Sequence, residues 1–311
     1  MLTKNSESYS ASSNKNNLYY LNKNYYICFG FLFFLLWSVN YFIKILPLEY
    51  SGYLLLLGVV CLTVKSDLNQ ETDVKPFLKI AIPFLILIIF VLASGNDIWH
   101  RVLSLELKIG SIIELNGIFK AIPFNDAALF RIYQPALLTE YMKLVYNTGF
   151  VLAVLIPLFR SALCLDFKKM LKYTLSAHIF QVIIITPFYF IFHLQEVWYV
   201  YNVPDMLVRN LGPSEIIETT LNCLPSMHTS IAFAMFLLVL REKDKFFKFF
   251  WGFYCISVIF STMYLEIHWV IDVFGGLLLG YLTVKLVDYV IIKITPKISK
   301  KFKIFIEKQP Q

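Results

Sequence analysis

Long apolar runs separated by short polar segments make up most of the chain. A helix that crosses a bilayer needs about 20 mainly apolar residues, within a range of about 17 to 25. Runs of this kind lie near residues 26–46, 49–64, 77–95, 141–159, 171–193, 223–240, 247–265 and 268–292, and the second is the shortest. We therefore predict an all-α polytopic membrane bundle with about eight transmembrane helices.

Three prolines fall inside the predicted spans. Pro83, Pro157 and Pro187 each remove one backbone donor from a helix. Within a membrane the freed carbonyl must find another partner, and a neighbouring helix can supply it. These prolines are therefore compatible with spanning helices that pack against one another.

Polar segments divide the chain into regions. Residues 1–25 are rich in Asn and Ser and have no small-residue cleavage site, which predicts a disordered cytoplasmic tail rather than a signal peptide. Three N-terminal spans would follow at 26–95, and the catalytic spans at 141–292. Residues 96–140 are too polar and broken to cross. They suit either a helix lying in the membrane interface, which we favour, or a folded external cap. Residues 293–311 form a basic tail.

Composition supports a membrane protein. The chain is 58% hydrophobic and 16% charged, whereas a soluble domain has about 25% charged residues. The net charge of +7 would suit a nucleic-acid binder, but the basic residues occur in short clusters between apolar runs, which is typical of cytoplasmic loops. We therefore expect no nucleic-acid partner. The five cysteines show no paired spacing and are predicted to be unpaired packing residues.

The basic clusters predict the orientation. They lie between the fourth and fifth spans, between the sixth and seventh, and after the eighth. Their members are Arg160, Lys168, Lys169, Arg241, Lys243, Lys245, Lys248, Lys293, Lys297, Lys300, Lys301, Lys303 and Lys308. With eight spans all three clusters fall on one side, which the positive-inside rule makes cytoplasmic. The starts of the sixth and eighth spans then both open on the extracytoplasmic side.

Each of these two openings contains a histidine. "LPSMHTS" places His228 at the start of the sixth span, with Pro225 predicted in the first helical turn and the free N–H groups of Ser226 and Met227 able to attract an anion. "EIHWVIDVFGG" places His268 and Asp272 four residues apart, on one helical face.

A carboxylate so placed holds one imidazole nitrogen and leaves the other free as a nucleophile. The two histidines therefore predict a two-step phosphoryl transfer. His268 would attack phosphorus and form a phosphohistidine, while His228 protonates the departing oxygen and later acts as the base. This chemistry needs no metal and no other cofactor.

These residues resemble two motifs of the type-2 phosphatidate phosphatase superfamily. Pro225 to His228 is similar to its Pro-Ser-Gly-His motif, and Ser261 to Asp272 is similar to its Ser-Arg, five residues, His, three residues, Asp motif. The resemblance covers roughly residues 130–292 and implies a six-helix phosphatase-type core. It assigns the nucleophile to His268, the orienting carboxylate to Asp272, the acid to His228 and a phosphate contact to Ser226.

The chain also departs from that pattern. Thr262 replaces the arginine of the third motif, Met227 replaces the glycine of the second, and the first motif, Lys, six residues, Arg-Pro, has no match. "PSMH" with "MYL" before His268, and "QPALLTEYMKLVY" at 134–146, are closer to the inositol phosphorylceramide synthase-like branch. The missing cations make other basic residues on the external side candidates for phosphate binding, namely Lys143, Arg131 and Arg209.

The predicted function is that of a lipid phosphatase or phosphotransferase acting on a lipid substrate at the extracytoplasmic face of the cell membrane, or at the Golgi or ER lumenal face in a eukaryote. An alternative is an inositolphosphate transferase to a ceramide-like acceptor, and another is a non-catalytic lipid transporter. We expect structural roles for the three other histidines and for the G-x-x-x-G pair, and leave Glu266 open between a loop residue and a site carboxylate. The residues concerned are His100, His178, His193, Gly276 and Gly280.

Overall fold

The structure is a computed structural model of the chain, and it describes residues 24–294 except 111 and 222. The tails predicted at 1–25 and 293–311 therefore lie almost wholly outside the described residues. The helices are α2 (Tyr25–Ile43), α3 (Leu48–Leu62), α4 (Val74–Ile109), α5 (Asn116–Ala121), α6 (Ala136–Leu163), α7 (Phe167–Thr174), α8 (Phe180–Ile191), α9 (Val197–Tyr201), α10 (Pro213–Thr220), α11 (Met227–Val239), α12 (Lys245–Tyr264) and α13 (Val270–Ile294).

Short elements join these helices. A 3-10 helix, η1 (Ala128–Arg131), precedes α6, and a π-helical turn, η2 (Leu175–Ile179), links α7 to α8. Two-residue strands, β1 (Ile113–Glu114) and β2 (Phe192–His193), pair in parallel. The predicted all-α bundle is confirmed.

Six segments are long and apolar enough to cross a membrane: Tyr25–Ile43, Val74–Gly95, Ala136–Leu163, Phe167–Ile191, Lys245–Tyr264 and Val270–Lys293. The other two predicted spans, 49–64 and 223–240, correspond to the shorter apolar helices α3 and α11. At about 1.5 Å per residue, the 13 residues of α11 reach only about 20 Å, less than the roughly 30 Å hydrocarbon core. Six of the eight predicted spans are therefore helices of spanning length, and the other two are shorter apolar helices.

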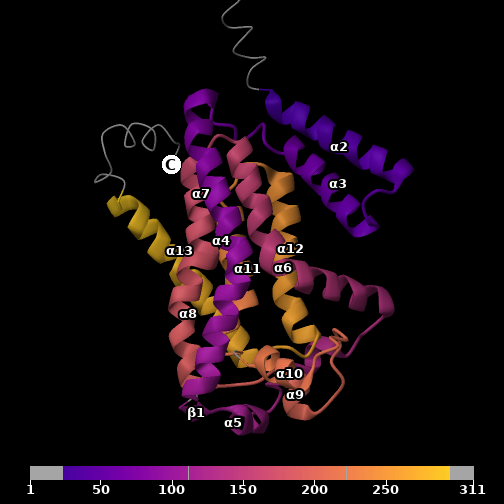
Figure 1. Cartoon of the computed structure of the whole chain (residues 1–311), viewed down its shortest axis with the longest axis vertical. Helices are drawn as coiled ribbons and strands as arrows, with labels where there is room; N and C mark the ends of the chain where they lie inside the picture. Colours follow the sequence, from indigo (N-terminus) through magenta and orange to yellow (C-terminus); the bar gives the residue numbers. More distant parts are fainter. Residues whose placement is uncertain (1–23, 111, 222, 295–311) are drawn as a thin grey trace, which may run out of the picture.

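The segment predicted at 96–140 begins inside a helix. α4 continues without a break to Ile109, and its 36 residues correspond to about 54 Å. Leu103 and Glu106, from the part predicted to lie in the interface, are buried. The favoured separate interfacial helix is therefore replaced by an extension of the third span. The remainder of the segment forms β1, α5 and η1 at the same end of the bundle as α9 and α10 (Figure 1).

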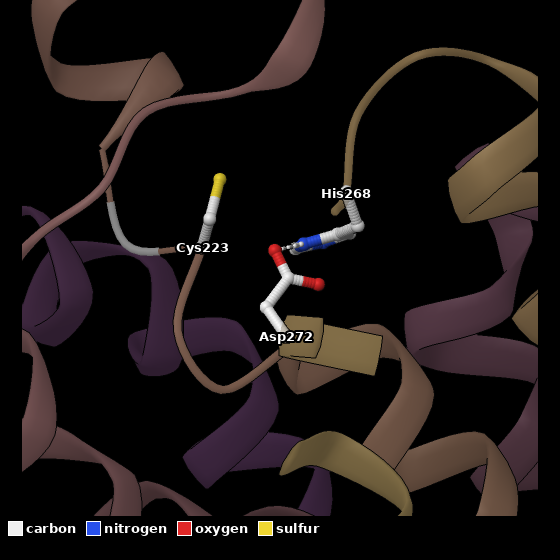
Figure 2. Close-up of side chains that lie close together, drawn as sticks. All are labelled: Cys223, His268 and Asp272. Carbon is white, nitrogen blue, oxygen red and sulfur yellow. Dashed lines mark hydrogen bonds and ion pairs between the residues drawn. The ribbon is translucent and has the colours of Figure 1, made fainter. Parts of the chain in front are cut away.

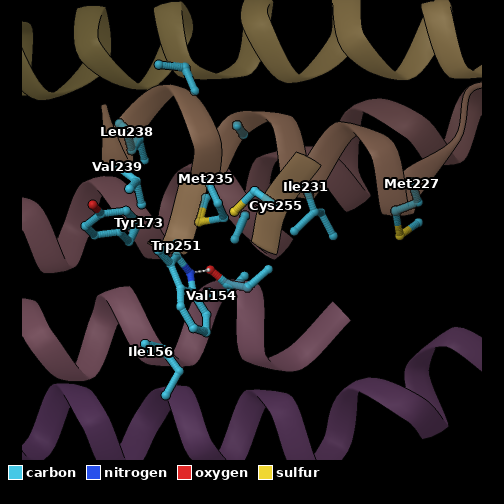
Figure 3. Packing of buried hydrophobic residues seen from close by; sticks show 14 of the residues in the cluster. Val154, Ile156, Tyr173, Met227, Ile231, Met235, Leu238, Val239, Trp251 and Cys255 are labelled. Carbon is cyan, nitrogen blue, oxygen red and sulfur yellow. Dashed lines mark hydrogen bonds between the residues drawn. The ribbon is translucent and has the colours of Figure 1, made fainter. Parts of the chain in front are cut away.

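α11 forms the centre of the C-terminal bundle, where it packs against α6, α12 and α13. Its apolar side chains, among them Ile231, Met235 and Leu238, are buried together with Trp251 and Cys255 of α12 (Figure 3). Because neighbouring helices cover most of its surface, α11 does not need the length of a lipid-exposed span.

Close packing of α13 against α11 depends on glycine. A Cβ at Gly276 would lie 2.6 Å from the Ser226 carbonyl oxygen, and one at Gly280 would lie 2.5 Å from the Ser230 oxygen. The predicted packing role of this G-x-x-x-G pair is confirmed.

The proline in α6 shows how a lost helical hydrogen bond is replaced. Pro157 has no N–H to give to the carbonyl of Ala153. The indole nitrogen of Trp251, on α12, donates to that oxygen at 3.3 Å (Figure 3). A neighbouring helix satisfies the freed carbonyl, as expected.

Candidate active site

His268 and Asp272 are in contact at the start of α13. His268 Nδ1 lies 3.2 Å from Asp272 Oδ2, and the Asp272 side chain is fully buried. The helix begins only at Val270, so His268 lies before it rather than on its first face. The same carboxylate oxygen accepts the backbone N–H of Trp269 at 3.1 Å, as the acidic residue of a capping box does. Asp272 thus fixes the helix start and the imidazole together.

The segment after α4 holds this helix start in place. The first two backbone N–H groups of α13 both donate to Asn125. Val270 N donates to the Asn125 main-chain oxygen at 2.9 Å, and Ile271 N donates to Asn125 Oδ1 at 3.0 Å. The indole of Trp269 donates to the Gln195 carbonyl at 2.8 Å and meets the ring of Phe119 edge-on. His268 is therefore positioned by residues distant in sequence.

His228 lies in the first turn of α11 and faces His268. The centroids of the two imidazole rings are 6.4 Å apart. On its other side His228 stacks on Tyr146 at 4.3 Å and meets Phe150 edge-on at 4.6 Å, both from α6. Among the described residues neither His228 nor Nε2 of His268 has a hydrogen-bond partner. Each of the two imidazoles therefore has a ring nitrogen free to act on a molecule between them.

Ser226 has a different environment from the one expected. α11 begins at Met227, so Ser226 is the N-cap and Pro225 precedes the helix; the prediction that Pro225 lies in the first turn was wrong. The buried Ser226 hydroxyl accepts from Thr229 N at 3.3 Å, and Ser226 N donates to the Asp272 carbonyl at 3.1 Å. These bonds join the two motifs, and they leave the N–H of Ser226 engaged rather than open to an anion.

A cavity of about 470 Å³ opens in front of the two histidines. Helices α4, α6, α8, α10 and α11 and the segments beside them supply its wall. The lining residues are His100, Leu103, Tyr146, Phe150, Tyr189, Glu196, Arg209, Leu211, Glu215, Glu218, Thr219, Leu221, Cys223, Met227, His228 and His268. The volume is in the range of small-molecule sites.

Of the three candidate phosphate-binding cations, the structure brings only Arg209 to this cavity. Arg131 instead pairs with Asp126 and Glu266, at 2.9 and 2.8 Å. Lys143 pairs with Glu140 on the surface of α6 at 3.0 Å. Met227 lines the cavity, whereas Ser226 is not among its lining residues.

Several cavity residues were not found from the sequence. Glu196, Glu215 and Glu218 come from a loop and from α10, where no motif marks them, and His100 was expected to be structural only. Tyr146 precedes His228 by more than 80 residues, so only the packing of α6 against α11 reveals its stacking contact.

Cys223, in the loop before α11, is close to the histidine–carboxylate pair (Figure 2). Possible ligand atoms of Cys223, His268 and Asp272 lie within 4.8 Å of one another, which is compatible with a metal site in the described part of the chain. However, burial raises the pKa of the Cys223 thiol well above its usual range, and Asp272 adds to the rise. Without a metal the thiol therefore stays protonated, and His268 Nδ1 is engaged by Asp272.

Comparison with known families agrees with this geometry. Residues 168–295 match the PAP2 superfamily. The match includes His228, His268 and Asp272 and ends with α13. No curated protein and no solved structure matched the chain.

Proposed function

We propose that this protein is an integral membrane lipid phosphatase or phosphotransferase that works through a phosphohistidine. The single observation that supports this best is the buried contact between His268 and Asp272 at the wall of a cavity that also contains His228. The match of residues 168–295 to the PAP2 superfamily supports the same class of reaction.

In the first step Nε2 of His268 attacks phosphorus while the bond from phosphorus to the leaving oxygen breaks. Protonated His228 gives its proton to that oxygen. Asp272 stabilises the positive charge that develops on the His268 ring, without taking up a proton. The products are a phosphohistidine and a released alcohol.

In the second step an acceptor hydroxyl attacks the phosphohistidine. His228, now neutral, takes the acceptor's proton, and the phosphorus–nitrogen bond breaks to restore His268. Water as acceptor gives a phosphatase, and a lipid alcohol gives a headgroup transferase. Headgroup transfer to a lipid alcohol is the finer proposal, supported by the similarity of the "PSMH" and "MYL" segments to the inositol phosphorylceramide synthase-like branch.

The reaction would take place at the extracytoplasmic side. The cavity lies at the start of α11, and the basic residues Arg241 and Lys243 follow the other end of that helix. The positive-inside rule assigns the basic end to the cytoplasm. A non-catalytic lipid transporter would not need a buried contact between His268 and Asp272, which is why we favour an enzyme.

The test is to trap the covalent intermediate. Purified protein is incubated with lipids labelled in the phosphate, quenched and examined for acid-labile phosphohistidine. We expect label on the wild type and on His193→Ala, a control histidine in β2 outside the cavity, but none on His268→Ala. Full turnover by His268→Ala would remove this residue as the nucleophile.

A further inference from the structure

The cavity in front of the histidines has an acidic wall. Its lining residues with a permanent charge are three carboxylates, Glu196, Glu215 and Glu218, against one guanidinium, Arg209, and the proposed mechanism adds one positive charge on protonated His228. A site for a doubly negative phosphate monoester would be expected to have an excess of cations. The described residues of this cavity show the opposite balance.

Arg209 is itself largely neutralised. It donates to both carboxylate oxygens of Glu196, at 3.2 and 2.6 Å, and to Asp205 at 2.7 Å. Burial alone would raise the pKa of Asp205, but the hydrogen bonds and charge of Arg209 lower it, so Asp205 stays ionised. Glu196 is almost completely buried and also accepts from the indole nitrogen of Trp198. Arg209 can therefore offer only part of its charge to a phosphate.

The other two carboxylates belong to α10. Glu215 and Glu218 are three residues apart, on one helical face, and both line the cavity. Glu215 accepts the N–H of Gly212 at 2.8 Å, which orients it without neutralising its charge. Glu218 lies 3.9 Å from the exposed imidazole of His100, a distance too long for a hydrogen bond. Glu218 therefore presents negative charge to the cavity.

Aromatic rings complete the wall. Tyr146, Phe150 and Tyr189 line the cavity with the histidines. One face of Tyr146 is covered by the stacked His228 ring, so these rings give the cavity mainly an apolar surface. The acidic groups thus favour a positively charged ligand group, whereas Nε2 of His268 needs a phosphorus atom within reach.

We propose that the substrate is a phosphodiester lipid with an ammonium-bearing headgroup. This inference rests on the proposed function. The phosphodiester would lie between His268, His228 and Arg209, and the ammonium group would face Glu218 and Glu215. A phosphodiester has a single negative charge, which a partly neutralised arginine can balance, and the headgroup cation balances the carboxylates. A lipid with a phosphate monoester dianion or an uncharged polyol headgroup would leave the Glu215 and Glu218 carboxylates of α10 without a positive partner.

The experiment compares four lipids with identical acyl chains in detergent micelles: phosphatidylcholine, phosphatidylethanolamine, phosphatidylinositol and phosphatidic acid. Headgroup or phosphate release is measured for the wild type, Glu218→Gln and Glu140→Gln. Glu140 is a matched control on α6, with a side chain 71% exposed and outside the cavity lining. We expect kcat/KM to be at least about tenfold higher for the ammonium lipids than for the other two, a preference of about 1.4 kcal/mol or more.

Glu218→Gln should lower kcat/KM for the two ammonium lipids about 5- to 20-fold, leave phosphatidylinositol nearly unchanged, and raise the relative rate on phosphatidic acid. Glu140→Gln should match the wild type. A wild type that prefers phosphatidic acid or phosphatidylinositol, or a Glu218→Gln loss equal for all four lipids, would overturn the headgroup inference and leave the phosphohistidine mechanism intact. Absence of turnover and of phosphoenzyme with every lipid would overturn both.

Discussion

One oxygen of Asp272 accepts from both His268 and Trp269, whereas its other oxygen has no partner among the described residues. The carboxylate therefore selects the His268 tautomer with the proton on Nδ1, which leaves the lone pair on Nε2 free for the proposed attack on phosphorus. A buried carboxylate with one unpaired oxygen is costly for the folded state. Such a cost is typical of a group retained for chemistry rather than for packing.

The substitution Asp272→Asn tests this role. Asn keeps the size of the side chain but loses the charge that stabilises the imidazolium, and it can favour the other tautomer. We expect kcat to fall by about 10² to 10⁴, equivalent to about 3 to 5 kcal/mol of barrier, with little change in KM. The measurement is steady-state kinetics together with thermal unfolding. A variant with near-normal kcat and equal or higher Tm would show that Asp272 is a packing residue.

Among the elements, the contact between α11 and α13 determines where the two histidines lie. Gly276 faces the Ser226 carbonyl and the Thr229 side chain, so α13 approaches α11 most closely within one turn of His228. Any side chain at this position would push the start of α11 away from α13.

Gly276→Ala should therefore reduce both stability and activity. We expect a loss of about 1 to 3 kcal/mol in the free energy of unfolding and at least a tenfold loss of kcat. Gly52→Ala in α3 is the control, because no atom lies within 4 Å of a Cβ there. It should leave activity unchanged and be neutral or slightly stabilising, by about 0.5 to 1 kcal/mol. Equal behaviour of the two variants in unfolding and kinetic assays would contradict the close-packing argument.

A buried ion network joins the elements at the opposite end of the bundle. Arg160 of α6 bonds to Asp67 at 2.6 Å and to Glu242 at 2.8 Å, and Lys169 contacts the same two carboxylates. Burial alone would raise the pKa of Asp67, but the charges of Arg160 and Lys169 lower it well below its usual range. The network thus connects the loop after α3 to α6, α7 and the end of α11.

Arg160→Ala should destabilise the protein by about 3 to 5 kcal/mol, because two buried carboxylates would lose their main counter-charge. Arg241→Ala is the control: its pair with Asp288 is exposed, and exposed pairs contribute about 0 to 1 kcal/mol. Thermal or denaturant unfolding in detergent would measure both. A loss for Arg160→Ala no larger than that for Arg241→Ala would mean that the network does not stabilise the fold.

For the molecule as a whole, the basic residues around the loop between α11 and α12 and the candidate active site lie at opposite ends. α9 and α10 lie at one end of the bundle, where α10 lines the cavity, and α12 begins at the other end (Figure 1). This arrangement follows from helices that run antiparallel to their neighbours, and it agrees with the distribution of Lys and Arg along the chain.

Accessibility labelling tests the orientation. Cys28 is exposed and would be replaced by Ser, whereas the other four cysteines are buried. A cysteine at exposed position Lys243 should react with a membrane-impermeant reagent only after permeabilisation. One at exposed position Asn210, beside the cavity residue Arg209, should react in intact cells. The reverse pattern would place the chemistry on the cytoplasmic face.

The sequence alone determined the helical class, most of the spans and the pair formed by His268 and Asp272. Span prediction succeeds because hydropathy is a local property, and every backbone polar group in lipid must be paired within a helix or a closed sheet. The His268–Asp272 contact was predictable because four residues separate its members, although the contact forms through a capping interaction before the helix rather than on its face.

The tertiary structure alone decided which residues surround the histidines. Arg131, Lys143 and Arg209 looked equivalent in the sequence, and all three pair with carboxylates, yet only Arg209 does so at the wall of the cavity. The acidic face of α10 and the stacking of Tyr146 on His228 likewise depend on how helices rotate and where loops turn back. Packing between segments distant in sequence determines which side chains line the cavity, and no local sequence pattern predicts it.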